Sequence, residues 1–123
     1  MTASRRSLGE LGERLAVQHL LAKGYTILER NFRTRSGEID IIARTGDVLA
    51  FIEVKCRRGD SRGTPAESVT VTKQRRLVEL AEAYGQAREG LPEERRIDVI
   101  SVEFSPAGRL IGLQHLESAV WAD

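Results

Sequence analysis

The stretch from Gly37 to Lys55, GEIDIIARTGDVLAFIEVK, decides the fold of this chain. It contains two short apolar runs separated by the four residues from Arg44 to Asp47. A Gly-Asp turn between runs rich in Val, Ile, Leu and Phe is typical of a β-hairpin. The chain is therefore expected to build its sheet outward from this hairpin.

The register of the hairpin follows if Ala43 and Val48 are its last paired residues, which places Asp40 opposite Phe51 and Glu38 opposite Glu53. Because side chains alternate along a strand, each face can be written down. One face is entirely apolar and carries Ile39, Ile41, Ala43, Val48, Ala50, Ile52 and Val54. The other mixes charged and large apolar side chains, namely Glu38, Asp40, Ile42, Leu49, Phe51, Glu53 and Lys55.

The mixed face predicts a metal site. In this register Asp40 and Glu53 are diagonal neighbours on adjacent strands, roughly 7–8 Å apart between backbones. Two such acids repel each other unless one takes up a proton or a divalent cation lies between them. Oxygen ligands without thiolate or imidazole suit Mg²⁺ or Mn²⁺, and Lys55 points into the same space. The alternative is a solvated polar face on which Glu53 pairs with Lys55 or an arginine.

Asp40 followed by Glu53-Val54-Lys55 resembles the D…(D/E)xK signature of the restriction-endonuclease-like, metal-dependent nucleases. Ile39 stands before Asp40, where the wider nuclease pattern often has Pro. The chain is also similar over nearly its whole length to the YraN-type family of small bacterial proteins. The segments that carry this similarity are Gly12-Glu13, Lys23-Gly24-Tyr25, Arg30-Asn31, GEIDIIA, FIEVK and Arg96-Ile97-Asp98-Val99.

The resemblance implies a site for one or two Mg²⁺ or Mn²⁺ ions and a catalytic role for Lys55. Its metal ligands would be Asp40, Glu53, the Val54 carbonyl and Glu13, because junction-resolving enzymes among these nucleases use a glutamate of the first helix. An outward-pointing Glu13 without a role is the alternative. Lys73 also matches the family pattern. Supporting positions would be Glu38, Asp98 and Gln74, and for Asp98 an arginine or the hairpin backbone is a better partner than a metal.

Basic residues add a second signal, although the formal net charge is only +1. All but three of the 19 basic residues are arginines, and they gather in clusters of which two flank the proposed site. The guanidinium fork suits phosphate oxygens. The predicted nucleic-acid-binding residues are Arg35, Arg57, Arg58, Arg62, Lys73 and Arg76. A solvated basic surface is an equal alternative for any single cluster.

The remaining elements follow from pattern. A capping box at Ser7-x-x-Glu10 predicts a helix that ends at Lys23-Gly24. A strand is expected over Tyr25–Arg33, a mobile loop over Arg57–Thr64, and a helix from Ser68 or Thr70 to about Arg88 with Val71, Leu77, Leu80, Ala81 and Tyr84 in its core. A strand over Arg96–Phe104 should return beside the strand of Glu53. A last strand near Leu110–Leu113 and a short helix holding Trp121 complete the order.

The predicted fold is α/β, a restriction-endonuclease-like mixed β-sheet flanked by helices in the order α-β-β-β-α-β-β. With 123 residues, 41% hydrophobic and 30% charged, a single domain over residues 1–123 is expected. No apolar run reaches membrane-spanning length and the N-terminus lacks a signal-peptide core, so we expect a cytoplasmic protein. The single cysteine, Cys56, excludes an internal disulfide.

The functional hypothesis is a Mg²⁺-dependent nuclease that acts on phosphodiesters, with branched or damaged DNA in repair or recombination as candidate substrates. The sequence does not select DNA over RNA, and symmetric cutting of a junction would require a homodimer. One alternative is a nucleic-acid-binding module that no longer cuts, and another is a protein-interaction domain. A zinc hydrolase is disfavoured because there is no closely spaced histidine pair.

Overall fold

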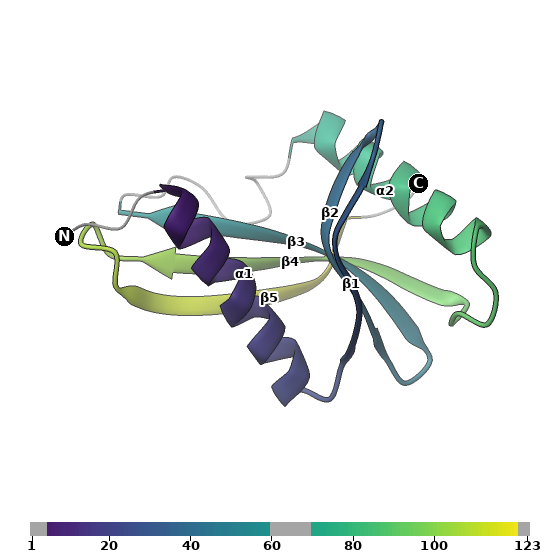
Figure 1. The fold of residues 1–123 in the computed structure, drawn as a ribbon, viewed down its shortest axis with the longest axis horizontal. Helices are drawn as coiled ribbons and strands as arrows, with labels where there is room; N and C mark the ends of the chain where they lie inside the picture. The colour runs from purple at the N-terminus through teal and green to yellow at the C-terminus, as the bar shows by residue number, and fades with distance from the viewer. Residues whose placement is uncertain (1–4, 60–69, 121–123) are drawn as a thin grey trace.

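The computed structural model describes residues 5–59 and 70–120 and confirms the predicted element order (Figure 1). Helices and strands succeed one another as α-β-β-β-α-β-β. Their bounds are α1 Arg5–Ala22, β1 Thr26–Thr34, β2 Gly37–Thr45, β3 Val48–Arg58, α2 Val71–Gln86, β4 Glu94–Phe104 and β5 Leu110–Val120. Neither described helix is both long and apolar enough to cross a lipid bilayer.

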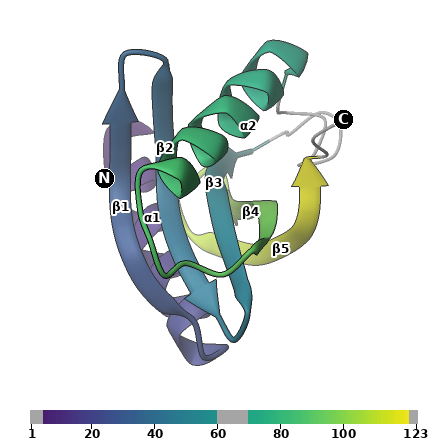
Figure 2. The same cartoon turned by 90° about the vertical axis from the view of Figure 1, so that its right-hand side faces the viewer.

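The five strands form one mixed sheet in the order β1-β2-β3-β4-β5. Strands β1, β2 and β3 make the predicted antiparallel meander. Strand β4 lies parallel to β3, with Glu53 level with Val99, as expected for a strand that returns after a helix. Strand β5 closes the sheet antiparallel to β4. The sheet twists strongly between β2 and β5 (Figure 2).

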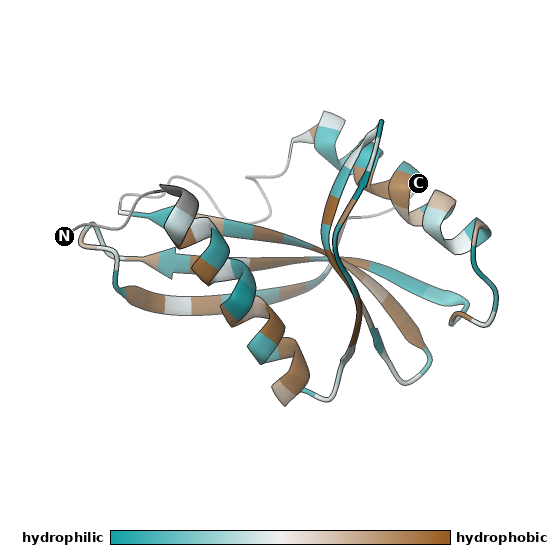
Figure 3. Ribbon diagram, in the orientation of Figure 1, coloured by the Kyte–Doolittle hydropathy of each residue, from teal (hydrophilic) through white to brown (hydrophobic). Residues whose placement is uncertain are grey.

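The helices cover opposite faces of the sheet, and each face has its own core. Alternate residues of β2 and β3, such as Ile41 and Ile52, pack against α1 together with Leu20 and Phe104. Their neighbours Ile42, Leu49 and Phe51 pack under α2. Apolar residues therefore run through the middle of the molecule, between helices whose outer sides are polar (Figure 3). This arrangement explains why both strands of the hairpin are almost continuously apolar.

The hairpin register differs from the predicted one. Ala43 pairs with Ala50 and Thr45 with Val48, so the turn contains only Gly46 and Asp47. Gly46 adopts a φ of +54°, and two-residue turns of this kind match the twist of the flanking strands better than longer ones. The pairing is shifted by two residues, so the predicted pairs of Asp40 with Phe51 and of Glu38 with Glu53 are wrong.

A shift by an even number of residues leaves side chains on the same faces, so the division into two faces largely survives. Ile39 is the exception, because it packs into the core under α2. Strand β1, which pairs with β2, is also irregular, with a register shift between Ile27 and Glu29 and a φ of +54° at Asn31. Such irregularities bend the edge of a sheet and redirect side chains.

Several local predictions are wrong. Helix α1 already includes Arg5, so Ser7 is not its N-cap. Val71 is exposed rather than part of the core, although the other four predicted residues of α2 are buried. Arg57 and Arg58 belong to β3 instead of a loop. Strand β5 continues to Val120 where a helix was expected, because it keeps pairing with β4. The predicted site residue Arg62 and Trp121 lie outside the described residues.

Candidate active site

Asp40 and Glu53 meet at one end of the paired part of β2 and β3. The regular pairing of the two strands extends as far as Ile41 opposite Ile52, and Asp40 and Glu53 are the next residue on each strand. Both line a cavity of about 390 Å³ beneath the start of α2. The two carboxylates are therefore brought together as predicted, although as near-opposite rather than diagonal neighbours.

The Asp40 carboxylate is held in place by the backbone of the neighbouring strand. The Val54 amide donates a hydrogen bond to Asp40 Oδ2 at 2.8 Å. Burial raises the pKa of Asp40, and the negative charge of Glu53 raises it further, to about 8 against an ordinary 3.8. The Val54 hydrogen bond acts in the opposite direction and is outweighed. The surroundings of Asp40 therefore disfavour the charged form of its carboxylate.

Glu53 is only 4% exposed and is contacted by two ammonium groups. The Lys55 Nζ lies 3.6 Å from Glu53 Oε1, and the Lys73 Nζ is in direct contact with the same oxygen. Burial and the charge of Lys73 lower the pKa of Lys55. Burial is the largest single effect on Lys73 and acts to lower its pKa, but the hydrogen bonds to Glu53 and Lys55 and the charges of Glu53 and Asp40 together outweigh it, so the pKa is raised. Lys73 is thus the main counter-ion of Glu53.

Helix α2 is positioned by its N-cap so that Lys73 reaches the strands. The Thr70 side chain accepts a hydrogen bond from the Lys73 amide at 3.2 Å, which is the usual capping geometry and stabilises a helix end by about 1 kcal/mol. Thr72 and Leu77 of the same helix line the cavity beside Lys73. The first turn of α2 consequently forms one wall of the site.

Glu13 lies close enough to influence the site without lining its cavity. It projects from α1, burial raises its pKa, and its Oε1 is buried without a hydrogen-bond partner. Its charge acts on Asp40 and on Cys56. Within residues 5–59 and 70–120, however, no three carboxylate, imidazole or thiol side chains are grouped closely enough to hold a metal ion. The structure therefore places Asp40 and Glu53 in one cavity, whereas Glu13 lies near that cavity without lining it.

The donor set nevertheless fits Mg²⁺ or Mn²⁺. Magnesium is commonly held by one or two carboxylates while it keeps several waters or takes phosphate oxygens. Asp40 and Glu53 supply two carboxylates in a common cavity, where burial and the charge of Glu53 disfavour the charged form of Asp40 until a cation is bound. A softer metal would have no thiolate or imidazole within the residues that line this cavity.

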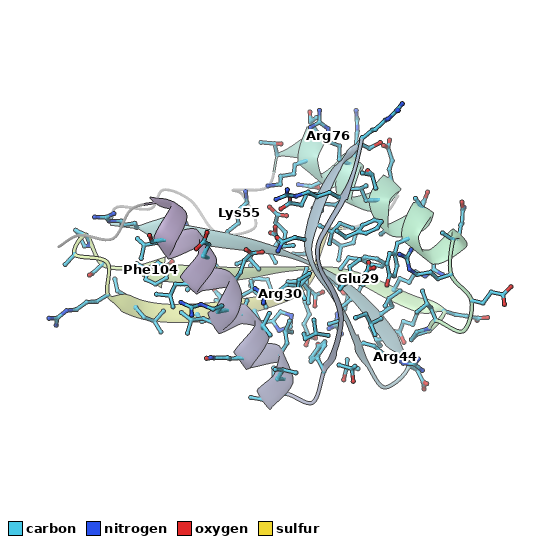
Figure 4. All side chains as sticks on the ribbon, in the orientation of Figure 1. Glu29, Arg30, Arg44, Lys55, Arg76 and Phe104 are labelled. Atoms are coloured by element: carbon cyan, nitrogen blue, oxygen red, sulfur yellow. The ribbon has the colours of Figure 1, made fainter. Side chains whose placement is uncertain are left out.

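Two predicted phosphate-binding arginines extend the cavity toward the β1–β2 turn. Arg35 and Arg76 line a second cavity of about 410 Å³, which also contains Ser36 and Glu79. Gly37 and Arg76 border both cavities, so the two are adjacent. Arg76 lies at the same end of the molecule as the β1–β2 turn, whereas Arg44 lies at the far end of the hairpin (Figure 4).

The other predicted arginines lie elsewhere. Arg57 and Arg58 border a different cavity of about 640 Å³, between the end of β3 and the β4–β5 turn. Arg58 donates to the Pro106 carbonyl at 3.1 Å, and Arg57 lies 4.0 Å from Glu103. Although this cavity is larger, none of the described residues that line it carries a carboxylate. We therefore place the chemistry in the cavity of Asp40 and Glu53.

The predicted supporting residues have separate roles. Glu38 lines the main cavity and forms an ion pair with Arg33 at 2.6 Å. Gln74 lies in the first turn of α2 next to Lys73. Asp98 is fully buried and faces away from the cavity residues. It pairs with Arg96 at 3.0 Å, as predicted for an arginine partner.

A hydrogen-bonded network around Asp98 was not foreseen from the sequence. His115 Nε2 lies 2.8 Å from the Asp98 carboxylate, and the Ser118 amide donates to it at 2.9 Å. Arg96 also donates to the Tyr25 hydroxyl at 2.5 Å. Burial alone would raise the pKa of Asp98, but these hydrogen bonds lower it. The network connects the segment after α1 with β4 and β5. It supplies the Asp98 carboxylate with hydrogen-bond donors without a metal.

Sequence reasoning also missed the contact between Lys73 and Glu53, since it assigned Lys73 only to phosphate. The signal was present, because Thr70 is a good N-cap and places Lys73 in the first turn of a helix that follows β3 directly. The cavity-lining Thr72 and Leu80 were not recognised as site residues either. Nothing in their spacing distinguishes them from ordinary helix positions.

Comparison with known proteins gives one consistent result. The model of the family described as "Uncharacterised protein family UPF0102" matches residues 12–102. A UPF0102 protein of Symbiobacterium thermophilum is 53% identical over 105 residues, which cover 85% of this chain and 89% of that protein. A UPF0102 protein of Geobacter metallireducens is 43% identical over 119 residues, which cover 97% of this chain and 96% of that protein. One of Dictyoglomus turgidum is 41% identical over 116 residues, which cover 94% of this chain and 98% of that protein.

Proposed function

The chain belongs to the uncharacterised protein family UPF0102, and we propose that it is a Mg²⁺-dependent nuclease that hydrolyses phosphodiester bonds of nucleic acid. The observation that carries this proposal is the juxtaposition of Asp40, Glu53 and Lys55 beside one cavity whose outer wall is basic. A site with two carboxylates and cationic side chains suits a phosphate-bound divalent cation better than any uncharged ligand.

The carboxylates of Asp40 and Glu53 would hold the metal ion, with the Val54 carbonyl and Glu13 as further candidates. The chemistry that a bound Mg²⁺ supplies is the neutralisation of phosphate charge and the lowering of the pKa of a water molecule. The Val54 amide fixes Asp40, so the ligand set is partly ordered in advance.

Lys55 acts on the reacting phosphate. Its ammonium lies at the edge of the carboxylate pair, where it donates hydrogen bonds to the phosphoryl oxygens and stabilises the charge that develops as water attacks phosphorus. In the hydrolysis the water oxygen forms a bond to phosphorus while the bond to one sugar oxygen breaks. Positioning of that water is the alternative role for Lys55.

The two adjacent cavities support a path for the nucleic acid. A backbone that places one phosphate at Asp40 and Glu53 can place a neighbouring phosphate at Arg35 and Arg76. These contacts reach the sugar-phosphate backbone and so carry little sequence preference. We propose DNA as the substrate and, more specifically, branched or damaged DNA in repair or recombination.

The test is cleavage of labelled duplex, single-stranded, flap and four-way-junction DNA, and of single-stranded RNA, in Mg²⁺, Mn²⁺ or EDTA. We expect metal-dependent cutting that falls at least about a hundredfold in Glu53→Gln. Glu82→Gln is the matched control, because Glu82 is exposed on α2 away from the cavity. Equal activity in Glu53→Gln and the wild type would identify a contaminating nuclease.

A non-catalytic nucleic-acid-binding module is the second candidate. It is favoured by the absence of a three-ligand group within the described residues and by the contact of Lys73 with Glu53. For such a module, Glu53→Gln should leave DNA binding unchanged and no substrate should be cut in any metal. The same cleavage experiment therefore separates the two candidates.

A further inference from the structure

Glu53 is shared between two cations that come from different elements. Lys55 follows it on β3, whereas Lys73 arrives from the first turn of α2. Both ammonium groups approach the same oxygen, Oε1. Because Glu53 is almost completely buried, these two cations replace the water that would otherwise solvate its charge.

A divalent cation on Asp40 and Glu53 is incompatible with this arrangement. It would place two positive charges beside the Lys73 ammonium, within the cavity that all three residues line. Like charges at such short separations repel strongly where water is largely excluded. Either Lys73 leaves Glu53 or the metal binds weakly.

Lys73 is the cation that is free to move. Its side chain is 39% exposed, compared with 24% for Lys55, and it starts from a helix end beside a cavity that has room for it. Lys55 lies within β3, where its backbone pairs with that of Ser101 on β4. A rotamer change of Lys73 would bring its ammonium toward Arg76 at the junction of the two cavities.

We propose that Lys73 is an internal counter-ion that neutralises Glu53 in the metal-free protein and is displaced toward Arg76 when a divalent cation binds Asp40 and Glu53. This inference rests on the proposed function and deepens it. Metal binding then delivers a cation to the phosphate path, so that metal and nucleic acid bind with positive cooperativity. Lys73 serves as a positioning residue for Glu53 before it serves as a phosphate contact.

The experiment measures Mn²⁺ binding directly, by isothermal titration calorimetry without nucleic acid. Lys73→Met removes the competing charge and keeps the apolar stem, so we expect Mn²⁺ to bind about tenfold more tightly than to the wild type. Arg75→Met is the matched control, since Arg75 is an exposed cation in the same turn of α2. It should change the affinity less than about twofold, because exposed charges are screened.

A second measurement does not depend on a variant. The side-chain nitrogen resonances of the lysines are followed by NMR during titration of the wild type with Mg²⁺. The Lys73 resonance should shift on saturation, whereas that of Lys23, which pairs with Glu117 at 3.7 Å, should stay unchanged. An unshifted Lys73 resonance at full Mg²⁺ occupancy would overturn the counter-ion role.

The outcomes separate this inference from the proposed function. Mn²⁺ binding to the wild type with equal or weaker binding to Lys73→Met refutes displacement and leaves the metal site intact. Binding to Lys73→Met alone would show that Lys73 blocks the metal and is not displaced by it, which also refutes displacement. If neither protein binds Mn²⁺ at millimolar concentration, the metal-dependent function itself fails and the counter-ion proposal fails with it.

Discussion

At the scale of single residues, the pKa of Asp40 depends on its burial and on its charged neighbours. Burial raises its pKa first and the neighbouring Glu53 raises it further, while only the Val54 amide stabilises its charged form. With a pKa of about 8, a large share of Asp40 carries a proton at neutral pH. Metal binding must then displace this proton, so metal affinity and pH are coupled at one residue.

The raised pKa predicts how stability depends on pH. In the unfolded chain Asp40 loses its proton near its ordinary pKa of 3.8, whereas the folded protein retains the proton up to about 8. The folded state therefore binds more protons between pH 4 and 8, and the free energy of unfolding falls as pH rises through that window. Asp40→Asn should flatten this dependence by up to about 1.4 kcal/mol per pH unit.

Urea denaturation in EDTA at a series of pH values measures this difference. The wild type and Asp40→Asn share every other titrating group, so only the difference between their slopes is informative. Asparagine can still accept the hydrogen bond from the Val54 amide, which keeps the local geometry comparable. Parallel curves for the two proteins between pH 4 and 8 would show that Asp40 is charged in the folded state.

At the scale of elements, the site depends on how closely α1 approaches β3. Gly12 faces Cys56, and a Cβ placed on Gly12 would collide with the Cys56 sulfur. The missing side chain lets the helix lie against the strand that carries Glu53. Cys56 is exposed as a residue, but partial burial of its thiol raises the pKa to about 11, which makes it a poor nucleophile.

This close approach predicts opposite effects for two glycines of the same helix. Gly9→Ala should stabilise the protein by up to about 1 kcal/mol, because alanine is the better helix former and nothing lies within 4 Å of its Cβ. Gly12→Ala should instead destabilise it by about 1–3 kcal/mol through overpacking. In a Cys56→Ala background the penalty should vanish. Chemical denaturation of the single and double variants checks this, and equal stability of Gly9→Ala and Gly12→Ala would contradict it.

At the scale of the whole molecule, the fold gathers distant segments at one end. At this end lie the turn between β1 and β2, the start of α2, and the residues of β2 and β3 where their pairing stops (Figures 1 and 4). The parallel pairing of β3 with β4 requires a crossover, and α2 is part of that connection. The basic and acidic parts of the site therefore come from different strands and a helix rather than from one motif.

This arrangement predicts a position-dependent effect of arginine on nucleic-acid binding. Arg76→Ala should weaken binding of a single-stranded oligonucleotide in EDTA, and the slope of log Kd against log salt should fall by about 0.7. Arg44→Ala, at the far end of the hairpin, should change neither quantity. Fluorescence anisotropy at several salt concentrations measures both, and equal slopes for the two variants would place the nucleic acid elsewhere.

Local patterns predicted much of this structure. The Gly-Asp turn between two apolar runs in Gly37–Lys55 identified the hairpin, and helical spacing identified the buried side of α2. Two errors have physical causes. The register was wrong because a four-residue turn and a two-residue turn leave the same residues on each face. The C-terminal segment was predicted as helix because its pairing with β4 cannot be seen in a local window.

The sequence by itself determined the element order and the identity of Asp40, Glu53 and Lys55 as neighbours, because alternation along two adjacent strands depends only on spacing. Only the tertiary structure decided that Lys73 contacts Glu53, that Arg35 and Arg76 share a cavity wall, and that Arg57 and Arg58 lie at another cavity. Those relations depend on how α2 folds back over the sheet. Packing between elements far apart in the chain sets that geometry, and no local pattern of residues encodes it.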